Sequence, residues 1–142
     1  MYNLDRFIDA QDPVYSTVLK ELQNGRKDSH WMWYIFPQLK ELGLSATSKF
    51  YGISGIEETR SYLQHPILRE RLEECLRVVI SCNETKPNKI FGSTDAMKFQ
   101  SSLTLFSMAE PYNTLFKEAL ERFFQGITDF ETEDLVIKEK RQ

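Results

Sequence analysis

The chain has 142 residues, of which 41% are hydrophobic and 27% are charged, with 6 glycines and 5 prolines. This length fits one domain of roughly 150 residues, and the composition excludes a disordered, collagen-like or low-complexity chain. The formal net charge is −3 and no basic face stands out, so a nucleic-acid partner is not expected.

No membrane or secretion signal is expected. The longest unbroken apolar run, Trp31 to Phe36, has six residues, whereas a membrane span needs roughly 20. Charged residues occupy positions 5, 6 and 9, where the apolar part of a signal peptide would lie. The sequence therefore predicts a cytoplasmic protein without a membrane partner.

The two cysteines and two histidines predict neither a disulfide nor a metal site. Cys75 and Cys82 are separated by two turns of a predicted helix, or about 10.5 Å, which is too far for a disulfide. No metal-binding motif joins them to His30 or His65, so we expect no metal and assign no cofactor.

The first half of the chain predicts four short helices, over residues 4–8, 13–23, 45–51 and 54–65. Asp12 is the expected N-cap of the second, because Pro13 suits the first helical position. Ser54 with a glutamate at position 57 has the form of a capping box and opens the fourth. No segment alternates with the period of a strand, so any sheet would have to come from short buried runs such as residues 32–36.

The second half predicts longer helices, over residues 66–82, 94–108 and 112–125, from apolar side chains at spacings of three and four. Ser93 or Thr94 is the expected N-cap of the middle one. Residues 84–88 are expected to form a loop. The sequence thus predicts an all-α, single-domain globular bundle of about seven helices over residues 1–130, followed by a charged C-terminal tail over residues 131–142.

The segment from His30 to Gln38 concentrates aromatic residues. Two interpretations remain open. The segment can be the central apolar element of a small helical core, since each aromatic side chain buries 150–250 Å². Alternatively, the segment lines a pocket with His30, Trp31, Trp33 and Tyr34. In that pocket a ligand ring would stack on the aromatic side chains, and a polar group of one of these side chains would orient it.

A polar stripe follows the predicted helix that starts near Thr94. Asp95, Lys98 and Ser102 fall on one face, and Ser101 flanks it. A lysine near a helix N-terminus, with serine hydroxyls, can hold a phosphate or carboxylate. The alternative is a solvated face on which Asp95 pairs with Lys98.

Known catalytic motifs are missing from the sequence. It contains no Walker A motif, no Gly-x-Ser-x-Gly elbow, no His-Glu-x-x-His and no glycine-rich dinucleotide fingerprint. Whether the protein is an enzyme stays open at this point.

Several motifs together resemble the mainly bacterial family known as domain of unknown function 1810. They are HWMWYIFPQ at 30–38, Ser45-x-x-Ser48, Tyr51-Gly52-Ile53, Tyr62-Leu63-Gln64-His65-Pro66 with Arg71-Leu72, and the stretch from Phe91 to Phe106. The resemblance implies a mainly α-helical single domain and brings no established activity. Some members carry the name calpastatin, which belongs to a largely disordered inhibitor and does not suit this compact sequence.

These motifs lead to a hypothesis for the function. We expect a cleft between the aromatic segment and the Thr94 helix that binds a small anionic ligand, nucleotide-like or a sugar phosphate. The expected roles are the anion site for Lys98, stacking for Trp31 or Trp33, hydrogen bonding for Ser101 and Ser102, and acid/base groups for His30 and Asp95. The alternative is a non-enzymatic interaction module or homodimer in which these residues are structural.

Overall fold

The computed structural model describes residues 2–141 and shows an all-α fold, as the sequence predicts. Ten α-helices and one 3-10 helix (η1) occur in these residues. They are α1 (Asp5–Gln11), α2 (Tyr15–Gln23), α3 (Met32–Ile35), η1 (Lys40–Leu42), α4 (Ala46–Tyr51), α5 (Ile56–Gln64), α6 (Pro66–Ser81), α7 (Pro87–Phe91), α8 (Ser93–Ala109), α9 (Thr114–Phe124) and α10 (Phe130–Lys140). Residues 2–141 contain no strand, only one parallel bridge between Leu39 and Ile53.

The helix count exceeds the expected seven because three short or terminal segments are also helical. The aromatic run forms α3, a single turn too short to show helical periodicity. The segment expected as a loop ends in α7, which Pro87 opens at its first position. The expected tail forms α10, where Asp129 is the N-cap and accepts a hydrogen bond from the Thr132 N–H.

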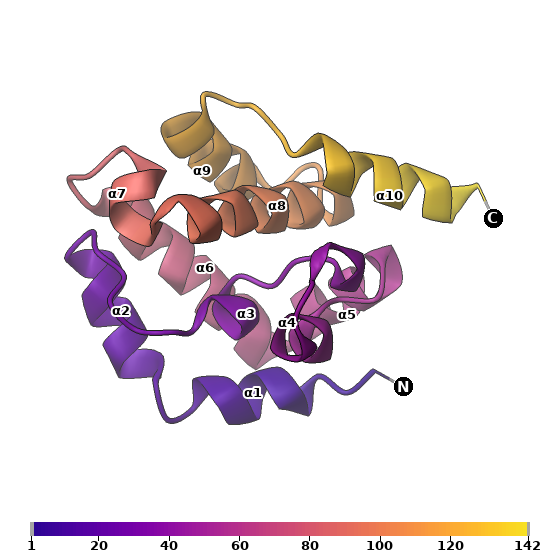
Figure 1. Cartoon of the computed structure of the whole chain (residues 1–142), viewed down its shortest axis with the longest axis horizontal. Coiled ribbons are helices and arrows are strands. Elements are labelled where there is room, and N and C mark those ends of the chain that lie inside the picture. Colours follow the sequence, from indigo (N-terminus) through magenta and orange to yellow (C-terminus); the bar gives the residue numbers. More distant parts are fainter. Residues whose placement is uncertain (1, 142) are drawn as a thin grey trace.

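Helix α8 lies across the molecule and organises the packing (Figure 1). It packs against α5, α7, α9 and α10, and also against the short α3. Helix α6 packs against α2, α5 and α9, while α1 contacts α3 and α6. Both ends of the described chain lie on the same side of Figure 1. No helix within residues 2–141 is long and apolar enough to cross a membrane.

Aromatic side chains connect these helices through the core. Phe99 of α8 is fully buried, with its ring centroid 4.8 Å from that of Phe36 and 4.7 Å from that of Phe91. Farther along α8, Phe106 contacts Tyr62 of α5 with a centroid distance of 5.2 Å. The aromatic segment is therefore held against the middle of α8 by the same ring cluster that fixes α7.

Three of the expected helix caps are wrong. Asp12 is the C-cap of α1, and α2 begins two residues later than expected, after Val14. Helix α5 begins after Gly55, and the Ser54 N–H donates to the Glu58 carboxylate at 2.8 Å, so no box forms with the residue at position 57. Gly92, with a φ of 83°, precedes α8 where a serine or threonine cap is expected. Such a φ favours glycine, so the chain turns sharply into α8 there.

Candidate functional site

A pocket of about 450 Å³ opens between the Gln38–Ser48 segment and the first half of α8. Its polar lining consists of Gln38, Ser45, Ser48, Thr94, Gln100 and Ser101, its charged lining of Lys98, Asp129 and Glu131, and its apolar lining of Leu42, Leu44 and Met97. Small-molecule sites commonly measure about 300–1,000 Å³ and combine apolar walls with a few polar groups. The pocket therefore has the size and the composition of a small-molecule site.

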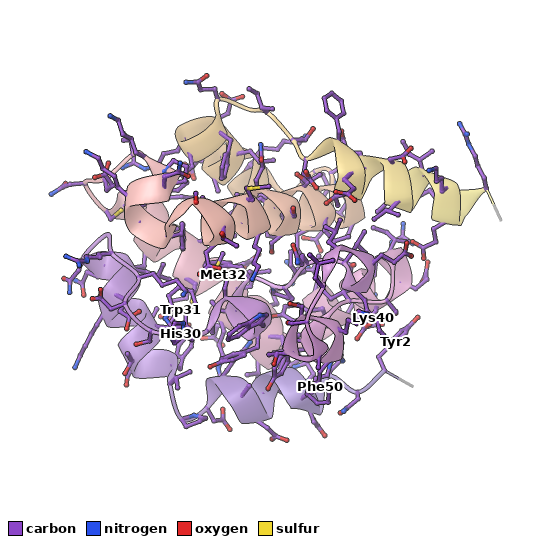
Figure 2. All side chains as sticks on the ribbon, viewed as in Figure 1. Tyr2, His30, Trp31, Met32, Lys40 and Phe50 are labelled. Atoms are coloured by element: carbon purple, nitrogen blue, oxygen red, sulfur yellow. The ribbon has the colours of Figure 1, made fainter. Side chains whose placement is uncertain are left out.

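Trp31 lies in the core and does not line this pocket. Its side chain is 1% exposed, and its indole Nε1 donates to the Glu21 carboxylate at 2.9 Å. In Figure 2 His30 and Trp31 lie on the α2 side of α3, and Lys40 lies on the opposite side. His30 is exposed, lines none of the described pockets, and accepts a 3.4 Å hydrogen bond from Tyr34 Oη through its carbonyl.

The Glu21 carboxylate holds the start of the aromatic segment in place. It also accepts hydrogen bonds from the backbone N–H groups of Asp28 and Ser29, at 2.9 and 3.0 Å, and from the Ser29 hydroxyl at 2.6 Å. Burial alone raises the pKa of the Glu21 carboxyl, but hydrogen bonds from Ser29, Trp31 and the loop backbone outweigh it and lower the pKa from 4.5 to about 2. This carboxylate therefore fixes the direction in which the chain enters α3.

Trp33 is half-buried and lies beside the pocket. It lines a cavity of about 10 Å³ that shares Gln38, Ser48 and Lys98 with the larger pocket. This cavity is about the size of one water molecule. The Lys98 ammonium lies 5.6 Å from the centroid of the Trp33 ring, within cation–π range. Of the two tryptophans, only Trp33 is placed beside the pocket.

Lys98 lines the pocket with only a weak carboxylate partner. Its ammonium is 3.7 Å from Asp95 Oδ1, whereas Lys27 binds Asp95 Oδ2 at 2.8 Å. The Lys27 side chain is 7% exposed and also lies over the Trp31 ring. Asp95 therefore ties the loop before α3 to α8 and lies outside the pocket, while the Lys98 charge is left largely available to a ligand.

The two adjacent serines of α8 have different surroundings. Ser101 lines the pocket, but its single hydroxyl hydrogen is shared between the Met97 carbonyl at 3.0 Å and Asp129 Oδ2 at 3.1 Å. Ser102 is fully buried, does not line the pocket, and its hydroxyl has no partner within residues 2–141. Ser101 therefore connects α8 to α10, and Ser102 belongs to the interior.

Part of the pocket was not predicted from the sequence. Asp129 and Glu131 reach it because α10 packs along α8. The available signal was local: an aspartate followed by glutamates at 131 and 133 is a typical helix start. Within residues 2–141, no three His, Cys, Asp or Glu side chains gather in a way that could hold a metal ion.

Comparison with known proteins decides the family. The family model described as "Protein of unknown function (DUF1810)" matches residues 1–136. The chain belongs to the DUF1810 family. This membership confirms the resemblance carried by the motifs. The crystal structure of the conserved hypothetical protein Rv1873 from Mycobacterium tuberculosis matches this DUF1810 chain with a TM-score of 0.93 and 43% sequence identity, over 96% of this chain and 97% of that chain. No curated protein matches the chain.

Proposed function

We propose that this DUF1810 protein is a cytoplasmic binding protein for a small anionic ligand, a nucleotide or a sugar phosphate, in the pocket between Gln38–Ser48 and α8. The observation that carries the proposal is the position of Lys98. Its ammonium borders a pocket of about 450 Å³ while its nearest carboxylate oxygen is 3.7 Å away. A lysine in this state binds a phosphate without first giving up a strong ion pair.

Groups around Lys98 complete the proposed anion site. Gln38 and Ser48 line both the pocket and the adjoining Trp33 cavity, at their junction, and Thr94 lies one turn before Lys98 on α8. These amide and hydroxyl groups can donate hydrogen bonds to phosphate oxygens. Trp33 offers an indole beside the same junction, suited to stack on a base or a sugar ring.

The expected roles of the other sequence-derived candidates change in this proposal. Ser101 contributes a pocket wall, and its hydroxyl is engaged by Met97 and Asp129. Trp31, Ser102, Asp95 and His30 are left out of the proposed contacts, because none of them lines the pocket. No acid/base role is proposed for them.

A thermal-shift screen against nucleotides and sugar phosphates tests the proposal. A ligand at 100 times its Kd stabilises the fold by about 2.7 kcal/mol, which corresponds to a rise of roughly 9 °C for a chain of this size. We expect a ligand-induced rise that disappears in Lys98→Met and persists in Lys117→Met, a matched change on the exposed face of α9. No rise with any compound, or an undiminished rise in Lys98→Met, would contradict the proposal.

One observation favours a second candidate function, an interaction module or homodimer. Leu44 and Met97 stand at the rim of the pocket with 95% and 70% of their surfaces exposed. Exposed apolar side chains that cluster mark protein–protein contact sites. Sedimentation of the wild type and Leu44→Ser over a range of concentrations separates the two candidates, since only an interface through this rim gives a dimer that the substitution weakens.

A further inference from the structure

The pocket carries opposite charges at its two ends. Lys98 lines both the pocket and the adjoining Trp33 cavity, so it marks the end next to α3. Asp129 and Glu131 line only the larger pocket. Asp129 is hydrogen-bonded to Ser101, three residues after Lys98 on α8, which is a displacement of about 4.5 Å along the helix axis. Lys98 and the residue of α8 that contacts Asp129 are thus offset along the helix by nearly one turn.

The acidic end lies at the N-terminus of α10, where Asp129 is the N-cap. All three hydrogen bonds that Asp129 accepts, from Ser101, the Thr132 N–H and the Thr132 hydroxyl, reach the same oxygen, Oδ2. Within residues 2–141, neither Asp129 nor Glu131 takes part in an ion pair. The pocket lining therefore holds one lysine against two carboxylates. A ligand with negative charge alone would be attracted at one end and repelled at the other.

Apolar side chains line the same pocket as the charged groups. Leu42 and Leu44 come from the segment around η1, and Met97 comes from α8. Hydroxyls of Ser45 and Thr94 lie in the same lining. A small ring with C–H faces and hydroxyl groups matches this mixture, because its faces cover apolar side chains while its hydroxyls exchange hydrogen bonds.

We infer that the ligand is a zwitterion with the chemistry of an amino-sugar phosphate: the phosphate binds Lys98, and the ammonium group binds Asp129 and Glu131. This inference rests on the proposed function and adds a positive charge to the proposed anionic ligand. It gives the two carboxylates in the pocket wall, the half-buried Asp129 and the exposed Glu131, a partner of opposite charge.

Calorimetric titration with two probes tests the inference. Glucosamine 6-phosphate and glucose 6-phosphate differ only in the group at one ring carbon, an ammonium or a hydroxyl. Because partly exposed ion pairs contribute modestly, we expect the wild type to bind the amino sugar about 5-fold more tightly. The preference should fall to about 2-fold in Glu131→Gln and in Asp129→Asn, where asparagine still serves as the N-cap of α10. It should persist in Glu118→Gln, an exposed residue of α9.

The possible results distinguish a failure of this inference from a failure of the proposed function. Equal affinity of the wild type for both sugars overturns the inference and leaves the anion site in place. A preference that Glu131→Gln and Asp129→Asn both leave unchanged also overturns it. Binding of neither sugar, together with no hit among the other anions, overturns the proposed function and the inference together.

Discussion

Replacing Glu21 by glutamine tests how the aromatic segment is held. The Glu21 carboxyl has a pKa of about 2 in the folded protein, against an ordinary value of 4.5. At about 1.4 kcal/mol per pKa unit, this difference corresponds to about 3 kcal/mol of stability at neutral pH. Because the folded pKa is the lower one, the contribution is complete above about pH 4.5 and is lost as the pH falls toward 2. Glutamine cannot accept the same four hydrogen bonds with a charged oxygen pair.

Urea unfolding followed by tryptophan fluorescence measures the effect. With an m-value near 2 kcal/mol per molar, the midpoint of Glu21→Gln should fall by roughly 1.5 M at pH 7. The difference from the wild type should shrink to nearly zero at about pH 2, where the wild-type carboxyl is itself becoming protonated. Glu118→Gln serves as the matched control and should leave the midpoint unchanged. A midpoint that does not move at pH 7, or a difference that is as large at pH 2, refutes this reasoning.

Further predictions concern two other structural contacts. The Arg6–Glu58 ion pair, at 2.9 Å, is buried, with side chains 9% and 4% exposed. Arg6→Met should therefore destabilise the fold by about 3 kcal/mol, as measured by chemical denaturation. The control Arg26→Met removes an exposed pair with Asp28 and should leave the denaturation midpoint unchanged. The adjacent serines of α8 should respond differently. Ser101→Ala should cost about 1 kcal/mol through the lost hydrogen bonding to Met97 and Asp129. Ser102→Ala removes a buried hydroxyl that has no partner within residues 2–141 and should be neutral or stabilising. Equal losses at the two positions would contradict this assignment.

Local signals in the sequence predict most of the fold. Leu68, Leu72 and Leu76, whose spacing predicts a helix over residues 66–82, are buried in α6. Ser45 predicts the start of α4, and it is the N-cap that accepts the Ser48 N–H at 3.0 Å. Gly25, with a φ of 69°, follows the end of α2 as expected. These elements are predictable because their signals come from residues within one or two turns.

The candidate site is predictable only in part, because its walls meet through tertiary packing. Helical position predicts a role for Lys98, residue type predicts one for Trp33, and both lie beside the pocket. The sequence could not choose between Trp31 and Trp33, since α3 is a single turn and gives no period that tells the core face from the pocket face. The Ser101–Asp129 contact spans 28 positions, so no local pattern reports it. The acidic end of the pocket can therefore be identified only from the structure.

The most direct test of the central claim locates ligand binding on the chain. Glucose 6-phosphate, the simpler of the two sugar phosphates, is titrated into ¹⁵N-labelled protein while backbone amide shifts are followed by NMR. The account predicts saturable shift changes centred on Gln38, Ser48 and Lys98 that are absent with uncharged glucose and absent in Lys98→Met. Saturable changes centred on the groove around Arg77 between α2 and α6, or none at the Lys98 end of the pocket, would contradict it.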